Sequence, residues 1–191
     1  VAGFGPHEAL EEVDCGGGFL VPGLMDAHMH VESAMVTPRE LARAVVPRGT
    51  TALVTDAHEI ANVHGIEGVR WILEASEGLP LDVFLMLPSC VPATSLETSG
   101  ASLSAADLAP LLDHPRVLGL GEVMNAPAVI DGAPDVLAKI CDARGRVDGH
   151  AVGLSGHRLE AYAATVESDH EAVTLEQGRE RVRLGMHVMI R

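Results

Sequence analysis

The stretch VPGLMDAHMHVES, residues 21–33, decides how the rest of this sequence is interpreted. It opens with apolar residues typical of a strand and then places His28 and His30 two positions apart, with Asp26 before them and Glu32 after them. Residues i and i+2 of a strand point to the same side, so both imidazoles can reach one ion. Taken alone, the pair fits a metal site and a strand that happens to carry histidines about equally well.

The composition is that of a globular domain, with 47% hydrophobic and 21% charged residues. The net charge of −14 argues against nucleic acid or an anionic membrane surface as a partner, whereas carboxylates attract metal cations. The three cysteines lie far apart in the chain, which disfavours a disulfide framework and favours a reducing cytoplasm. The longest apolar runs are too short to span a membrane.

From residue 21 onward, short apolar runs alternate with helix-like stretches. The expected strands are 19–28, 51–58, 82–89, 117–123, 147–151, 166–172 and 187–191. The expected helices are 37–49, 65–78, 104–114, 133–145, 155–165 and 174–185. This order predicts an α/β fold with a parallel sheet. Because a closed (β/α)₈ barrel typically needs roughly 250 residues, we expect residues 21–191 to form an incomplete TIM-type barrel of about seven strands.

The first expected helix carries clear boundary signals. Thr37 is the expected N-cap, Pro38 occupies the first turn, Glu40 completes a capping box and Gly49 lies near the end. These residues predict a helix over 37–49.

Polar residues recur at the carboxyl end of nearly every expected strand. They are His28, His30 and Glu32; Asp56, His58 and Glu59; Ser89; Glu122 and Asn125; His150; and Asp169, His170 and Glu171. In parallel barrels the active site lies at that face and is built from several strand ends. Imidazole and carboxylate groups are ligands of Zn, Fe or Mn, and no cysteine is placed to select a softer site. The sequence therefore predicts a metal site, with ligands enough for two ions and a carboxylate between them.

The predicted chemistry is hydrolytic. A bound divalent ion lowers the pKa of its water and supplies hydroxide at neutral pH, while a carboxylate or imidazole shuttles protons to the leaving group. The H-x-E pattern at His30-Val31-Glu32 lacks the P-C-x-x-C partner of the zinc nucleobase deaminases. The segment HEIAN, residues 58–62, ends in Asn and so is not H-E-x-x-H.

Longer strings carry a family resemblance. PGLMDAHMH resembles the PG-x-(I/L/M)-D-x-H-x-H signature of the amidohydrolase superfamily. DAHMHVESAMVTPRELARAVVPRGTT, DAHEIANVHG, MLPSCVPATSLETSGA, GLGEVMN, VDGHAVGLSG, ESDHE and RLGMHVMIR resemble, in order, the bacterial adenine deaminases of that superfamily. The resemblance extends over nearly the whole chain.

The resemblance implies metal-dependent hydrolysis of adenine to hypoxanthine and ammonia in purine salvage. Hydroxide generated on the metal would attack C6 of adenine. It also implies a (β/α)₈ barrel with a small β-sandwich built from both chain ends, of which residues 1–20 would be a remnant. The cofactor would be two divalent ions, manganese or iron, with zinc as a third candidate.

Site residues follow from the matching motifs. His28 and His30 match ligands on the first strand, Glu122 matches the carboxylate that bridges the metals, and His150 and His170 match ligands on later strands. Glu122 and His150 are the expected catalytic residues. Substrate-contacting or supporting roles are expected for Glu32, Ser33, Asp56, His58, Glu59 and Asp169.

Some features depart from the family pattern. Val152 and His157 replace the usual Pro and Lys of GHAPGLSGK. The aspartate of the superfamily's eighth strand would lie beyond Arg191, so we expect an incomplete or inactive fragment that needs a missing C-terminal segment or a second copy of the chain. Two alternatives stay open, a non-catalytic metal-binding remnant and another amidohydrolase acting on a cyclic amide. MLPSCVPAT and DAHEIANV argue against the second.

Overall fold

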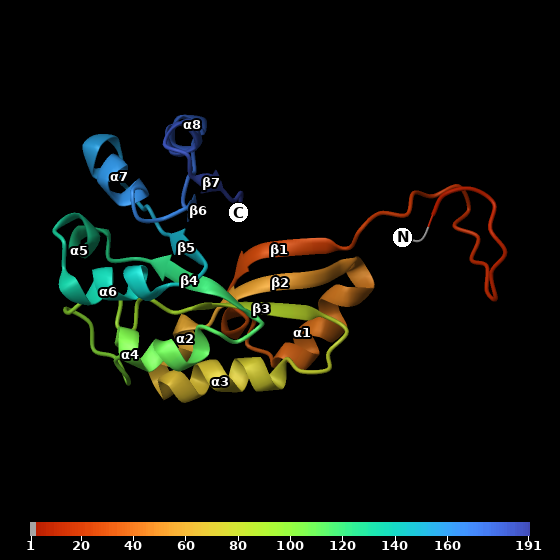
Figure 1. Cartoon of the computed structure of the whole chain (residues 1–191), viewed down its shortest axis with the longest axis horizontal. Coiled ribbons are helices and arrows are strands. Elements are labelled where there is room, and N and C mark those ends of the chain that lie inside the picture. Colours follow the sequence, from red (N-terminus) through yellow and green to blue (C-terminus); the bar gives the residue numbers. More distant parts are fainter. Residues whose placement is uncertain (1–2) are drawn as a thin grey trace.

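A curved parallel sheet forms the centre of the molecule (Figure 1). The structure is a computed structural model that describes residues 3–191. Its strands are β1 (Leu24–Met29), β2 (Thr50–Asp56), β3 (Asp82–Leu87), β4 (Val117–Val123), β5 (Arg146–Gly149), β6 (Ser168–Asp169) and β7 (His187–Val188). The first five form one parallel sheet in chain order, and β6 and β7 form a second parallel pair.

The β6–β7 pair follows β5 in the same rotational order. The backbone N–H of Glu167, just before β6, donates to the carbonyl of Val147 in β5 at 2.9 Å. The sheet therefore curls through all seven strands of the described chain. The predicted α/β fold, a partial TIM-type barrel, is confirmed.

The helices lie along the outer side of the curl (Figure 1). They are α1 (Pro38–Val45), α2 (His58–His64), α3 (Ile66–Ala75), α4 (Ala105–Leu108), α5 (Ala126–Ile130), α6 (Pro134–Asp142), α7 (Gly156–Ala163) and α8 (Leu175–Arg183). Three 3₁₀ turns are η1 (Glu32–Ala34), η2 (Val46–Arg48) and η3 (Ala109–Leu111). All six predicted helical stretches are present. The short helices α2 and α5 were not predicted, because five to seven residues are too few to show a helical period.

The boundary signals of α1 are largely confirmed. The hydroxyl of Thr37 accepts a hydrogen bond from the Glu40 N–H at 3.4 Å, and Pro38 is the first helical residue. Gly49 ends the following 3₁₀ turn with a φ of +97°, in the left-handed region that glycine adopts without strain. The capping-box prediction was wrong for the Glu40 side chain, which pairs with Arg43 at 3.0 Å because that partner lies one turn along the helix surface.

Aliphatic side chains fill the core between the sheet and the helices. The larger cluster joins the outward faces of β3, β4 and β5, represented by Leu85, Leu120 and Val147, to the inner faces of the helices. A smaller cluster around Leu53 and Leu81 lies beneath α1. Branched and small apolar residues fill the core because the chain has only three Phe, one Trp and one Tyr.

Residues 3–23 contain no helix or strand and extend away from the sheet (Figure 1). Phe4, Leu10, Phe19 and Leu20 of this segment are exposed. The assignment of residues 1–20 to a β-sandwich stays a prediction, and residues 1 and 2 lie outside the described part. No helix in residues 3–191 has the length and apolarity needed to cross a membrane.

A side chain from α7 joins β4 to β5 where their pairing becomes irregular, between Leu120 and Val123. The Tyr162 hydroxyl donates to the Val123 carbonyl at 2.5 Å and accepts from the His150 N–H at 2.8 Å. Tyr162 is fully buried, and burial raises the pKa of its phenol well above the usual range. The hydroxyl therefore stays protonated and can serve as donor and acceptor at once.

Replacing Tyr162 with Phe should destabilise the protein without changing the packing of the ring. The variant leaves a buried N–H and a buried C=O without this partner, and each such loss costs about 1–3 kcal/mol. We expect the free energy of unfolding, measured by urea denaturation, to fall by at least about 1 kcal/mol. An unchanged denaturation midpoint would contradict this role of the hydroxyl.

Candidate metal centre

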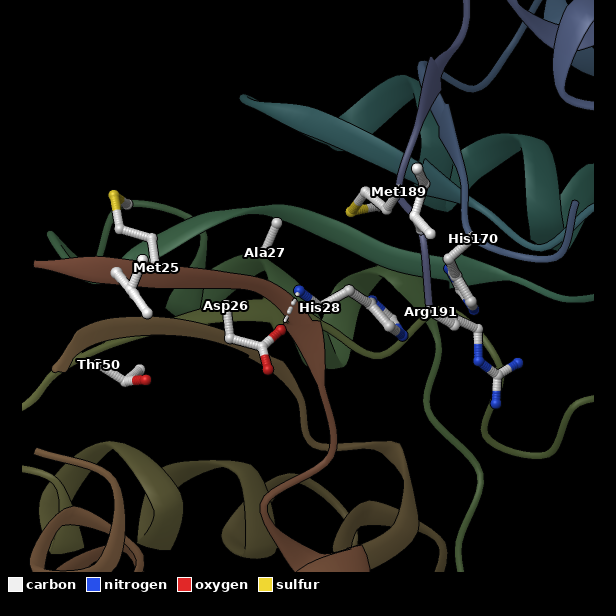
Figure 2. Close-up of a pocket in the computed structure, with 10 residues that line it drawn as sticks. Met25, Asp26, Ala27, His28, Thr50, His170, Met189 and Arg191 are labelled. Atoms are coloured by element: carbon white, nitrogen blue, oxygen red, sulfur yellow. Dashed lines mark hydrogen bonds between the residues drawn. The ribbon is translucent and has the colours of Figure 1, made fainter. Parts of the chain in front are cut away.

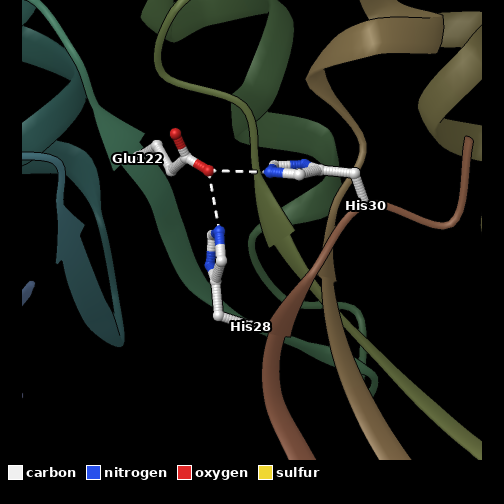
Figure 3. Close-up of side chains that lie close together, drawn as sticks. All are labelled: His28, His30 and Glu122. Atoms are coloured by element: carbon white, nitrogen blue, oxygen red, sulfur yellow. Dashed lines mark ion pairs between the residues drawn. The ribbon is translucent and has the colours of Figure 1, made fainter. Parts of the chain in front are cut away.

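Glu122, in β4, occupies the centre of a histidine cluster. Its side chain is only 2% exposed. Oε1 lies 2.7 Å from His28 Nε2, 2.9 Å from His30 Nε2 and 3.6 Å from His170 Nε2, and Oε2 lies 3.0 Å from His150 Nδ1. Figure 3 shows the rings of His28 and His30 directed at the same carboxylate oxygen. The structure thus brings together all five metal ligands predicted from the sequence.

These five residues form two ligand groups with one member in common. His28, His30 and Glu122 make one group, and Glu122, His150 and His170 make the other. Within each group the potential ligand atoms lie within 4.8 Å of one another. A carboxylate has two oxygens, so Glu122 can serve both groups at once.

Several atoms of the cluster lack hydrogen-bond partners. His28 Nε2, Glu122 Oε1 and His170 Nδ1 are buried and unpartnered, although the first two atoms lie only 2.7 Å apart. Buried polar atoms are normally hydrogen-bonded, so two unpartnered atoms as close together as His28 Nε2 and Glu122 Oε1 need another explanation. Nitrogen and oxygen lone pairs directed at a shared space fit a divalent cation.

The backbone fixes which nitrogen of His30 is free. His30 Nδ1 lies 2.9 Å from the carbonyl oxygen of Asp56, at the end of β2. A carbonyl can only accept, so Nδ1 carries a proton and Nε2 is the nitrogen that faces Glu122, where it can bind either a proton or a metal ion. Hydrogen bonds of this kind orient metal-ligating histidines.

The charges of the cluster shift the pKa values of its members in the absence of a metal. Burial lowers the pKa of His28, but the Asp148 and Glu122 carboxylates outweigh it and raise the pKa to about 9. His30 behaves in the same way beside Glu122 and Asp56, and its pKa also rises to about 9. Burial, together with the nearby His28, lowers the pKa of His170 to about 4. The carboxylates therefore draw cations, whether protons or metal ions, to His28 and His30.

Asp148 was not predicted as a site residue, although the sequence carried a signal for it. Asp148 Oδ2 lies 3.9 Å from His28 Nδ1, and its Oδ1 accepts a hydrogen bond from the Ser168 hydroxyl at 2.5 Å. Asp148 lies in β5 and precedes His150, the residue directly after the strand, by two positions, so the i, i+2 rule applied to His28 and His30 pointed to Asp148 as well.

The residues after β1 and β2 form a polar border beside the first ligand group. Glu32 Oε1 accepts the backbone N–H of Ile60 at 3.1 Å, and burial raises the pKa of the Glu32 carboxyl. The Ser33 hydroxyl donates to the carboxylate of Glu59. These predicted site residues therefore connect η1 to α2.

Asp56 and His58 extend this border toward the histidine–Glu122 cluster. Asp56 is fully buried, and its Oδ2 lies 3.4 Å from His58 Nδ1. The His58 ring centroid lies 4.5 Å from that of His30. His30, His58 and Glu59 are also close enough to share a cation.

Asp169 turns away from the ligand cluster. Its carboxylate accepts Arg181 Nε and the Ala151 N–H, each at 2.7 Å, and the Asp169 and Arg181 side chains are fully buried. Arg181 also donates to the Ala151 carbonyl at 2.8 Å. Asp169 therefore supports the backbone beside His150 and His170 and does not line the ligand space.

A cavity of about 660 Å³ reaches the cluster from the side between β1 and the last residues of the chain. Figure 2 shows His28 projecting from β1 on one side of the cavity and His170, Met189 and Arg191 together on the other side. The two imidazoles are stacked, with ring centroids 3.9 Å apart. The ligand cluster is thus accessible to small molecules.

Comparisons with known proteins agree with this geometry. The sequence profile of the amidohydrolase family matches residues 19–191. The chain is 52% identical over 193 residues to adenine deaminase 2 of Carboxydothermus hydrogenoformans and 55% identical over 194 residues to an adenine deaminase of Syntrophobacter fumaroxidans. An adenine deaminase of Nitratidesulfovibrio vulgaris is 54% identical over 193 residues.

Each alignment covers 99–100% of this chain but only 34% of the relative, so the chain spans about a third of the length of these proteins. The profile match extends from just before β1 to the last residue and includes every residue of the histidine–Glu122 cluster. The chain therefore belongs to the amidohydrolase family.

Proposed function

We propose that this chain contributes the metal centre of an enzyme that deaminates adenine. The observation that carries the proposal is the single buried carboxylate of Glu122, surrounded by four imidazoles from β1, β5 and β6 or their ends. Relatives that match the chain over its whole length carry the name adenine deaminase, which favours adenine as the substrate.

Two divalent ions would be held by residues of this chain. His28, His30 and Glu122 would hold one ion, and Glu122, His150 and His170 would hold the other. Imidazole and carboxylate ligands suit manganese, iron or zinc. When bound, such ions supply Lewis-acid chemistry and make water nucleophilic at neutral pH.

The reaction balances with water as the second substrate. A C–O bond forms at C6 of adenine, the bond from C6 to the exocyclic nitrogen breaks, and the products are hypoxanthine and ammonia. His58 and Glu59 lie beside the first ligand group, where their side chains could contact the purine. The Ser33 hydroxyl donates a hydrogen bond to Glu59, and the Asp56 carboxylate lies 3.4 Å from His58 Nδ1, so each group has a polar neighbour beside it. Roles in purine salvage and a cytoplasmic location remain predictions.

Two other functions would use the same ligands. An amidohydrolase acting on a cyclic amide would need a similar metal centre, and a non-catalytic metal-binding protein would need only the ligands. The names of the relatives favour deamination over both. Assays with adenine and with dihydroorotate, a cyclic amide, separate the first two functions.

The first prediction from this proposal concerns metal binding. The 191-residue chain should bind two Mn(II) ions, measured by electron paramagnetic resonance of free Mn(II) during titration. Glu122→Gln keeps the size of the side chain but removes the charge shared by both ligand groups. Losing a hydrogen bond that another residue makes to a metal ligand typically costs about 10–100-fold in metal affinity. Losing the Glu122 ligand itself should therefore weaken Mn(II) binding at least about tenfold.

Glu67→Gln is the matched control. Glu67 lies on α3 with its side chain 77% exposed and pairs with Arg70 on the same helix. The Glu67→Gln variant should bind Mn(II) as tightly as the unaltered chain. Equal Mn(II) affinities for Glu122→Gln and Glu67→Gln would exclude Glu122 as the shared ligand.

The second prediction concerns catalysis and uses a chimera, because the chain spans a third of its relatives. Residues 1–191 replace the matching segment of the Carboxydothermus hydrogenoformans adenine deaminase 2. We expect Mn(II)-loaded chimera to consume adenine, measured by loss of adenine absorbance. His28→Ala should abolish turnover, since it removes a ligand of the first ion. His157→Ala, at a fully exposed side chain on α7, should not.

Metal content and the thermal midpoint of the chimera show whether it has folded. A folded, metal-loaded chimera that hydrolyses dihydroorotate instead of adenine would replace our proposal by the cyclic-amide alternative. One that binds metal and turns over neither substrate would favour the non-catalytic alternative.

A further inference from the structure

Two residues outside the ligand cluster form a continuous hydrogen-bonded path to Glu122. The Ser89 hydroxyl, just after β3, donates to the backbone carbonyl of Glu122 at 2.5 Å. The Lys139 ammonium, on α6, donates to the backbone carbonyl of Ser89 at 2.8 Å. Both side chains belong to residues that are only 9% exposed. The path thus runs from a helix, across the end of β3, to the residue whose carboxylate lies between the ligand groups.

The position of Glu122 explains why such an anchor is needed. The pairing of β3 with β4 ends at Leu87 and Leu120, two residues before Glu122. Beyond that point the Glu122 carbonyl has no partner in the β3–β4 ladder. It accepts from the Ser89 hydroxyl and from the nearby N–H of Met124, at 2.8 Å. Of these two bonds, only the one from Ser89 ties Glu122 to another segment, the one that follows β3.

A buried lysine is costly, which makes the placement of Lys139 informative. Burial lowers the pKa of Lys139, and the carboxylates of Asp135 and Asp107 partly oppose that effect. Removing an ammonium group from water is unfavourable unless it is hydrogen-bonded. The Ser89 carbonyl is the acceptor that the structure provides for it.

Lys139 and Ser89 lie in the wall of a cavity of about 690 Å³ between the β3–α4 loop and α6. None of the five predicted metal ligands lines this cavity. The bonds of these two residues reach Glu122 through its backbone carbonyl and not through its carboxylate.

We propose that Ser89 and Lys139 are positioning residues that hold the Glu122 backbone so that its carboxylate can serve two metal ions. The proposal rests on the metal centre proposed above. A bridging carboxylate must keep both oxygens in place, and a shift of its backbone would move both together. Partners that orient metal ligands typically contribute 10–100-fold to metal affinity.

The chain offers a close control in Ser76. Its hydroxyl donates to the Ile72 carbonyl at 2.7 Å, and its own carbonyl accepts from Arg116 Nη1 at 3.1 Å. Ser76 is 1% exposed and lies at the end of α3. Ser76 thus makes the same two kinds of bond as Ser89, but not to a metal ligand.

The test is Mn(II) titration of the 191-residue chain and its variants, with free Mn(II) followed by electron paramagnetic resonance. Ser89→Ala and Lys139→Met should each weaken the binding of at least one Mn(II) by about 10–100-fold. Ser76→Ala should lower the thermal midpoint without changing Mn(II) affinity. Ser89→Thr keeps the hydroxyl, and the cavity beside it has room for a methyl group, so it should restore Mn(II) binding.

Each other result has a definite meaning. Unaltered Mn(II) affinity in Ser89→Ala would overturn the positioning role. An equal loss of Mn(II) affinity in Ser76→Ala would also overturn it, because both losses would then follow from lower stability in general. If Ser89→Ala does not fold, unaltered affinity in Lys139→Met overturns the role. Failure of the unaltered chain to bind Mn(II) would overturn the metal centre itself. If the chimera binds Mn(II) but does not turn over adenine, the proposed deamination is contradicted and the metal centre and the positioning role are not.

Discussion

The buried carboxylate of Glu122 is the constraint on which the rest of the site depends. An isolated charge in a protein interior is strongly unfavourable, so it must be compensated by hydrogen bonds, by opposite charge or by a metal ion. In the structure the compensation comes from four imidazoles, and they outweigh the effect of burial, so the pKa of Glu122 stays well below its usual range. The same negative centre that holds protons on His28 and His30 would hold divalent cations in their place.

Placing so many polar groups together requires the strands to separate at their carboxyl ends. The pairing of β1 with β2 shifts between Asp26 and Met29, and that of β4 with β5 shifts between Leu120 and Val123. Separation leaves backbone groups without ladder partners, and side chains replace them. The Tyr162 hydroxyl bonds to backbone groups at the ends of β4 and β5, and the Ser89 hydroxyl bonds to the backbone of β4. The Thr55 hydroxyl accepts the Val31 N–H at 3.3 Å. The site and the irregular ladder are therefore two consequences of one arrangement.

This explains which parts could be predicted from the sequence. The strand ends could, because parallel strands place their carboxyl ends at one face, and so could members of the polar cluster such as His28 and Glu122. Asp148 could also have been found, by its spacing from His150. Residues such as Tyr162 and Lys139 could not, because they reach the site from helices, and their direction depends on how each helix packs on the sheet. The side chain of Glu40 illustrates the same limit, since two partners compete for it and only the structure shows which one it contacts.

The cluster also holds the curled sheet together. Within the described residues, β1 is paired only with β2, and no ladder connects it to β6 or β7. Across this opening, the His28 ring of β1 stacks on His170, and both imidazoles approach the same oxygen of Glu122. These contacts join segments about 140 positions apart in the chain, and they require the intervening strands to be curled. A ligand that binds the folded state but not the unfolded chain stabilises the folded state. Metal ions bound across β1, β4 and β6 would therefore stabilise the curl itself, which makes metal binding and the geometry of the barrel one coupled equilibrium.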